Sequence, residues 1–186
     1  MFCLQHLSEK LILQLTNSIQ GVTHMEQQSH IKCYYLGKPY PLYTKVDISI
    51  KKVTIQWDGK AFICISPKAG EVDIADALQA FYIKAGRKFI EERLKLYQPH
   101  FKVKYKSFSI ENDPTKWGSC SSNRHLTFHW KLIMFPLSAI DYVVVHELCH
   151  LIHMNHDRSF WRLVGKIYPK YKEAMVILGT EKTREV

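Results

Sequence analysis

The sequence predicts a single α+β domain, with a small antiparallel sheet in its N-terminal half and a helical C-terminal part. Residues 31–66 alternate apolar and polar side chains as strands do, whereas residues 72–100 and 137–178 repeat apolar side chains at helical spacing. The 186 residues are 46% hydrophobic and 12% aromatic, which excludes an intrinsically disordered chain and suffices for one well-buried core. We therefore expect one folded unit without an interdomain linker.

The first thirty residues, 1–30, are expected to form a peripheral extension. Leucine or isoleucine recurs every four residues from position 7 to position 19, which predicts one short amphipathic helix, and Glu9 and Lys10 make the segment a poor secretory signal. The longest apolar run, residues 132–145, is shorter than the roughly 20 residues that a membrane helix needs. Because the five cysteines are scattered and form no C-x-x-C pair, we expect a soluble protein of the reducing cytoplasm, without a membrane partner.

Residues 31–70 are expected to form the antiparallel sheet. Apolar and polar residues alternate up to Asp58-Gly59, a dipeptide typical of a two-residue hairpin turn. Residues 71–100 form the helical part, either as one long helix or as two shorter ones with Gly86 as the weakest point.

Residues 101–180 complete the domain. The segments 101–110 and 124–130 alternate as strands, with a short extended segment between them. Alternating lysines on the first of these strands are expected to line a solvated face, with phosphate binding as the alternative: Lys102, Lys104 and Lys106.

Helices are expected after residue 135. The first opens at Pro136, with Ser138 and Asp141 at a spacing like that of a capping box, and continues at least to Ile152. Asp157 is the expected N-cap of the second helix, and a last short helix follows.

A candidate metal-binding motif lies within the first of these helices. The string His146-Glu147-Leu148-Cys149-His150 has the form H-E-x-x-H. Because four residues make about one helical turn, both imidazoles project from one face and can bind one metal ion. Glu147 is within reach of a water molecule on that ion, so it is the candidate catalytic residue. The alternative is an ordinary helix with histidines at its polar edge. Cys149 points away from both histidines and is expected in the core.

A catalytic zinc ion needs a third protein ligand, and two histidines follow the motif. His153 lies on the same helix face as His146, but an unbroken helix spreads three imidazoles over roughly 10 Å, too far for one tetrahedral ion. His156 is the better candidate if the helix breaks near Met154-Asn155, with Asn155 as a left-handed residue that turns the chain back. A distant Asp or Glu is a further alternative.

A combined signature is formed by His146, Glu147, His150 and His156, with Trp117-Gly118-Ser119-Cys120 before them and Phe160-Trp161 after them. This set resembles the YgjP-like metallopeptidase family, relatives of the SprT-like zincins, and the resemblance covers roughly residues 31–179. The resemblance implies a zincin-like minimal core over residues 31–180. It also implies one zinc ion per chain on the three matching histidines, with Glu147 as catalytic acid and base.

The chemistry of such a site allows two hydrolyses. We expect first a metallopeptidase, in which a zinc-bound water activated by Glu147 attacks a peptide carbonyl. The alternative is a metal-dependent nucleotide or phosphate hydrolase of the nucleoside triphosphate pyrophosphatase type, helped by surplus Lys and Arg. The net charge of +9, from 26 basic and 17 acidic residues, also allows a third alternative, a nucleic-acid-binding module with a structural metal.

Several residues near the motif have both a structural and a functional interpretation. The segment 124–130 is a candidate peptide-binding strand, because zincins commonly bind extended peptide beside the active-site helix. His125 and His129 are expected to be solvated strand residues, with a functional role as the alternative. The residues that either line the site or only support it are Trp117, Cys120, Phe160 and Trp161.

Overall fold

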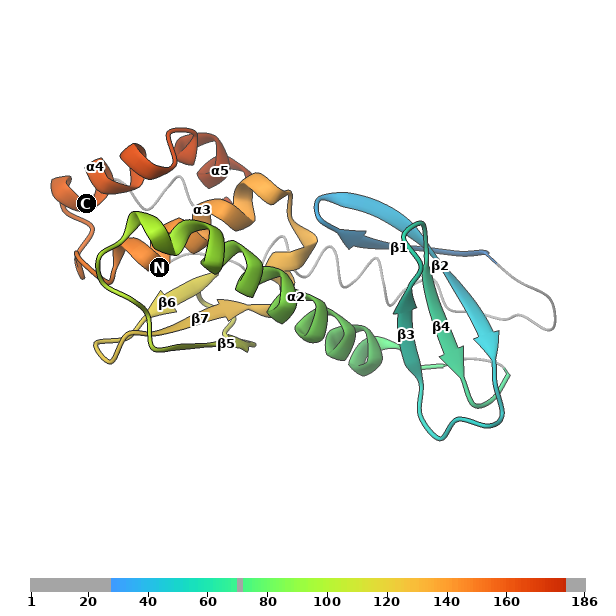
Figure 1. Cartoon of the computed structure of the whole chain (residues 1–186). Helices are drawn as coiled ribbons and strands as arrows, with labels where there is room; N and C mark the ends of the chain where they lie inside the picture. The colour runs from blue at the N-terminus through green and yellow to red at the C-terminus, as the bar shows by residue number, and fades with distance from the viewer. Residues whose placement is uncertain (1–27, 70–71, 180–186) are drawn as a thin grey trace.

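The computed structural model describes residues 28–69 and 72–179, and their mixed α+β content confirms the predicted fold class. In chain order the elements are β1 (Gln28–Tyr35), β2 (Lys38–Val46), β3 (Thr54–Trp57), β4 (Phe62–Ser66), α2 (Ala75–Tyr97), η1 (Gln98–His100), β5 (Ser107–Glu111), β6 (Gly118–Cys120), β7 (His125–His129), η2 (Trp130–Met134), α3 (Leu137–Cys149), α4 (Arg158–Ile167) and α5 (Tyr171–Ile177). Figure 1 shows a sheet of β1–β4 at one end, the helices α3–α5 with a second sheet at the other, and α2 joining them. The helix expected within residues 1–30 lies outside the described residues.

The four-stranded sheet has the order β1-β2-β4-β3 and is mixed. The prediction of a wholly antiparallel sheet is wrong for one pair, because β2 and β4 run parallel. After β2 the chain crosses to the far edge of the sheet, returns along β3, and turns at the predicted hairpin so that β4 inserts beside β2. In that turn the Asp58 carboxylate accepts the N–H groups of Lys60 and Ala61 at 2.7 Å each, and Gly59 has φ +96°.

One face of this sheet packs against α2. The ring centroid of Phe62 lies 5.3 Å from that of Phe81 and 5.9 Å from that of Tyr82. The Tyr82 hydroxyl donates to the Tyr34 carbonyl at 2.8 Å. The helix is continuous over 23 residues. Gly86 does not break it, because this residue is buried and faces η2, where an added Cβ would lie 3.7 Å from Ile133.

The second sheet has the order β5-β7-β6, with β7 in its centre. The predicted strand at 101–110 forms only from residue 107, so Lys102, Lys104 and Lys106 are exposed as expected but lie outside a strand. The Gln98 side chain explains the difference. Its Nε2 donates to the Val103 carbonyl at 3.0 Å and its Oε1 accepts the Tyr105 N–H at 3.3 Å, so the side chain bonds backbone groups that a strand partner would otherwise bond.

Helix α3 differs from the prediction at both ends. Pro136 is the N-cap and no side chain caps the helix, so the capping box expected from Ser138 is wrong. Asp141 instead makes a two-bond ion pair with Arg93 of α2, with Nε–Oδ1 2.5 Å and Nη2–Oδ2 2.8 Å. The helix ends at Cys149 rather than at Ile152 or beyond.

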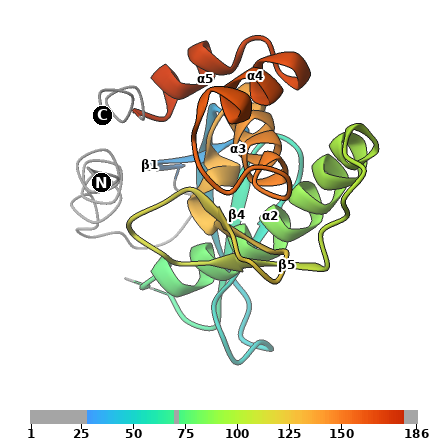
Figure 2. The same ribbon diagram turned by 90° about the vertical axis from the view of Figure 1, so that its left-hand side faces the viewer.

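Helices α4 and α5 pack against α3, and Figure 2 shows α3 between them and the sheet that holds β5. Asp157 is the N-cap of α4 as predicted, because its carboxylate accepts the Phe160 N–H at 2.9 Å. Within residues 28–69 and 72–179, no helix has the length and apolarity needed to span a membrane.

Candidate metal centre

Three imidazoles meet at the C-terminal end of α3. The Nε2 atom of His146 lies 3.2 Å from Nε2 of His150 and 2.9 Å from Nε2 of His156. The potential ligand atoms of all three residues lie within 4.8 Å of one another. No other group of three or more His, Cys, Asp or Glu side chains in the described part of the chain meets at one point in this way. The structure therefore brings together the three residues that the motif singled out.

The turn after α3 carries His156 back to the helix end. Leu151 donates its N–H to the Leu148 carbonyl at 3.1 Å, and both Ile152 and His153 donate to the Cys149 carbonyl at 3.0 Å. These bonds tighten the last turn, so the helix ends at Cys149, before the expected Ile152. The predicted break at Met154-Asn155 with a left-handed Asn155 is wrong, since Leu36 and Arg124 are the non-glycine residues with positive φ among those described.

Each motif histidine is oriented by a hydrogen bond at its other ring nitrogen. Nδ1 of His150 lies 2.9 Å from the His153 carbonyl oxygen, which can only accept, so Nδ1 carries the proton and Nε2 presents a lone pair to the cluster. Nδ1 of His146 lies 3.2 Å from the Tyr142 hydroxyl, one turn earlier on α3. His153 thus acts through its backbone, and its ring contacts Ser159 Oγ at 3.3 Å instead of joining the cluster.

The donor set fits a zinc ion. A tetrahedral ion with Zn–N bonds of about 2.0–2.1 Å places its nitrogen ligands about 3.3 Å apart, close to the observed separations. Burial lowers the pKa of His146 well below its ordinary value, and the neighbouring histidines lower it further. Burial also lowers the pKa of His150 and His156. The three rings are therefore neutral at physiological pH, which is the form that binds metal.

Two aromatic residues of α4, Phe160 and Trp161, pack against the imidazole rings. The Phe160 ring centroid lies 4.9 Å, 4.6 Å and 4.7 Å from those of His146, His150 and His156, respectively. Trp161 stacks on His156 at 5.7 Å. Phe160 and Trp161 therefore support the site, in agreement with their interpretation as core or scaffold residues.

Glu147 lies in a buried position between α3 and β6. Its side chain is only 4% exposed, and Oε2 has no hydrogen-bond partner among the described residues. Burial raises the pKa of Glu147 to about 8. The positive charge of Lys116 lowers this pKa, but by less than burial raises it. Gly118 of β6 makes room for this carboxylate, because a Cβ there would lie 2.7 Å from Oε1 and 2.8 Å from Cγ of Glu147. The sequence pattern placed Gly118 in the signature but did not indicate this contact.

Trp117 directly precedes β6, and Cys120 is the last residue of that strand. Burial and, to a lesser extent, the charge of Glu147 raise the pKa of the half-buried Cys120 thiol to about 11, so the thiol is unreactive. Trp117 packs on Phe135 with ring centroids 4.7 Å apart. Cys149 is buried as predicted.

The two strand histidines have separate environments. His129 is buried, 6% exposed, and its expected solvated position is wrong because its ring packs against Trp117 and Trp130. Its Nδ1 accepts the Lys131 N–H at 3.1 Å, and burial lowers its pKa to about 4. His125 lies on the outward face of the sheet between the Ser107 and Ser109 hydroxyls, at 2.8 Å and 2.9 Å.

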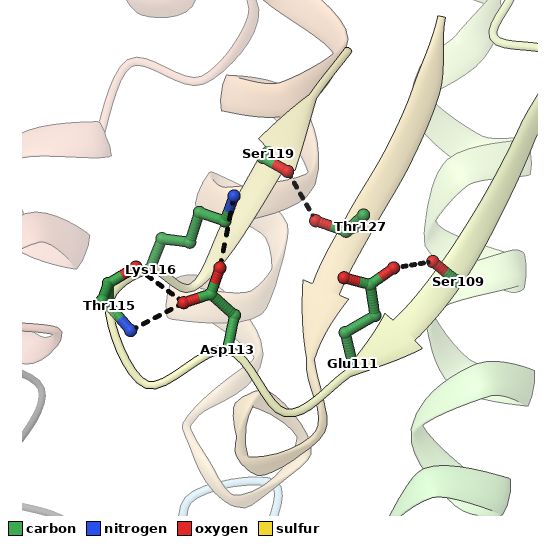
Figure 3. Close-up of polar contacts among 7 residues, drawn as sticks. All are labelled: Ser109, Glu111, Asp113, Thr115, Lys116, Ser119 and Thr127. Carbon is green, nitrogen blue, oxygen red and sulfur yellow. Dashed lines mark hydrogen bonds and ion pairs between the residues drawn. The ribbon is translucent and has the colours of Figure 1, made fainter.

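Polar side chains on the outward face of the β5-β7-β6 sheet form hydrogen bonds with one another (Figure 3). Ser119 and Thr127 hydroxyls lie 2.6 Å apart across β6 and β7, and Ser109 donates to Glu111 at 2.6 Å. In the loop before β6, Asp113 accepts from Thr115 and pairs with Lys116 at 3.3 Å. None of these residues joins the three-histidine cluster.

Comparisons with known proteins come from sequence and from structure. A family model described as YgjP-like, metallopeptidase domain, matches residues 4–181, a range that begins earlier than residue 31, where the motif-based resemblance begins. Among solved structures, the chain is similar to the metallopeptidase zymogen abylysin of Pyrococcus abyssi. The identity is 23% and the TM-score 0.45, over 51% of this chain and 96% of that chain. No curated protein matches the chain.

Proposed function

The chain belongs to the YgjP-like metallopeptidase family, and from that premise we propose that it is a zinc-dependent hydrolase, first of all a peptidase, with zinc held by His146, His150 and His156. The observation that carries the proposal is the meeting of three neutral imidazoles beside a buried carboxylate, Glu147. Hydrolytic zinc sites need three protein ligands, an open position and a nearby proton acceptor. The exposed side of the cluster at His156 supplies the open approach.

The chemistry divides between the ion and Glu147. When bound, zinc would lower the pKa of a water molecule and polarise the scissile carbonyl. Glu147 accepts the proton of the attacking water and returns it to the leaving amine. Burial raises the pKa of Glu147 to about 8, near the working pH, which suits a group that both accepts and returns a proton.

The strand that presents an extended substrate is β6 in this proposal, in place of the segment 124–130. β7 is paired on both sides, with β5 and with β6, so it has no free edge. β6 is the edge strand of that sheet, and its Gly118 lies against Glu147. A peptide that adds to β6 by main-chain hydrogen bonds therefore brings a carbonyl next to the proposed catalytic residue.

An activity screen tests the proposal. The zinc-loaded protein is incubated with unfolded casein, a peptide library and the nucleoside triphosphates, with and without a chelator. Peptide cleavage that the chelator abolishes and added zinc restores is the expected result. Release of pyrophosphate without peptide cleavage would favour the nucleotide hydrolase, and zinc binding without hydrolysis of any substrate would favour a structural metal.

Gly118→Ala is expected to lower activity about 10²-fold while zinc content stays the same. The new Cβ would lie within 3.0 Å of three Glu147 side-chain atoms, so the carboxylate must move from its position. A shift of about 1 Å at a reacting group is enough for such a loss. The measurement is the steady-state rate beside elemental analysis for zinc.

Gly86→Ala is the matched control, because an added Cβ at this buried helical position meets only Ile133, at an ordinary 3.7 Å. It should leave the rate unchanged and slightly raise the melting temperature, since alanine favours helix. Equal rates for Gly118→Ala and Gly86→Ala would show that the approach of β6 to Glu147 is unimportant for turnover.

A further inference from the structure

The four-stranded sheet has a second face, which points away from α2. Side chains on the first face, such as Phe62 and Tyr35, belong to the hydrophobic core that α2 covers. Because side chains alternate along a strand, their neighbours lie on the opposite face. We call this opposite face the outer face; its central residues are Lys32, Tyr34, Pro41, Tyr43, Lys45, Ile63 and Ile65.

No aromatic ring among the described residues contacts the tyrosines of the outer face. Tyr34 and Tyr43 make no ring contact with another described aromatic residue and do not pack against the core, although both are only half-buried. On the face that α2 covers, in contrast, Tyr35 and Tyr40 both contact Trp57, with ring centroids 5.5 Å and 4.5 Å apart. The outer face therefore offers two π surfaces on the sheet.

The charge of this sheet is strongly positive. Residues 31–69 contain seven lysines and two aspartates, and all seven lysines are exposed. Both aspartates are engaged in local turns, Asp47 with Ser49 and Asp58 with the hairpin backbone. None of the lysines of this segment forms an ion pair within the described residues. An anionic partner complements such a surface.

The register places cations beside the rings. Lys32 pairs with Pro41, two residues before Tyr43 on β2, and Lys45 lies two residues after Tyr43. Tyr34 pairs with Pro39, so the two tyrosines are about 13 Å apart along the strand direction. Lys32 lies between them on the same face.

We propose that the outer face binds single-stranded nucleic acid. Bases of a single strand stack on aromatic side chains of a sheet while lysines contact the backbone phosphates, and such binding needs little sequence preference. An acidic peptide would use the lysines but not the two π surfaces, so nucleic acid explains more of what the face offers. The surface lies at the end of the molecule opposite to α4 (Figure 1), so it does not depend on the proposed hydrolytic site.

Fluorescence anisotropy of labelled 12-nucleotide oligo(dT) and oligo(U) with the full chain tests this proposal. Tyr43→Ala should weaken binding about tenfold, whereas Tyr43→Phe keeps the ring and should stay within about twofold of the wild type. The double variant Lys32→Glu and Lys45→Glu should weaken binding and lower the slope of log affinity against log salt by about 1.4. The double variant Lys170→Glu and Lys172→Glu, at two exposed lysines at the start of α5, is the charge-matched control and should bind like the wild type.

Circular dichroism and zinc content establish that each variant is folded. No binding of either oligonucleotide by the folded wild type at low salt would overturn the proposal, as would equal affinity in all variants. Tighter binding of poly-glutamate than of the oligonucleotides, unaffected by Tyr43→Ala, would also overturn it and identify an acidic polypeptide as the partner. Peptide or nucleotide hydrolysis should be the same in all these variants, so this test and that of the proposed function fail separately.

Discussion

Replacing Glu147 with Gln is expected to lower the hydrolytic rate by about 10² to 10⁴-fold without loss of zinc. Gln has the size of Glu and fits the narrow space beside Gly118, but it cannot accept a proton from water. Glu147 lies outside the three-histidine cluster, so the metal should remain. The measurement is the rate on the best substrate from the activity screen, together with zinc content and melting temperature.

Glu173→Gln provides the control for the charge change, because Glu173 is an exposed residue of α5. It should retain the wild-type rate. A Glu147→Gln variant that is folded, zinc-loaded and fully active would contradict the role given to Glu147 and leave the proton transfer to another group.

Asp141→Ala is expected to cause the largest loss of stability, about 3 kcal/mol in the free energy of unfolding. The Asp141 side chain is 7% exposed and that of Arg93 21%, so removal of the carboxylate leaves a guanidinium in a mostly buried place without its partner. The pair joins α2 to α3, the helix that carries the motif, and its loss should loosen that contact. Urea unfolding at pH 7 of the zinc-free protein measures the effect.

The exposed pair of Lys95 with Glu91 is the matched control, since its N–O distance is 2.7 Å but its side chains are 69% and 47% exposed. Glu91→Ala should change stability little, because solvent screens such pairs. In a double-mutant cycle, the loss for Arg93→Met with Asp141→Ala should be smaller than the sum of the two single losses. Additive losses would show that the two side chains do not stabilise each other.

Local signals were enough to predict that the three histidines meet. The H-E-x-x-H spacing places two imidazoles one turn apart on any helix, and the sixth-position His156 can return to them after a tight turn. Asp157 was predictable as an N-cap because the capping interaction is made within three residues. These features depend on neighbours in the sequence, so one sequence is enough to predict them.

Contacts between distant segments were not predictable in this way. β4 lies between β2 and β3 in the sheet and therefore runs parallel to β2. The local sequence of these strands does not indicate this order. The burial of His129 depends on Trp117, which precedes it by twelve residues, and alternation alone predicted a solvated side chain. The space that Gly118 leaves for Glu147 requires β6 to pack on α3, which no local pattern indicates.

The zinc content of the purified protein shows directly whether the three histidines bind the metal. Elemental analysis without added zinc is made on the wild type beside His150→Ala and His156→Ala, with His125→Ala as a control because His125 lies outside the cluster. We expect about one zinc ion per chain in the wild type and in the control, and loss of zinc in the other two variants. A wild type that binds no zinc even when it is supplied, or variants that keep it, would contradict the three-histidine site.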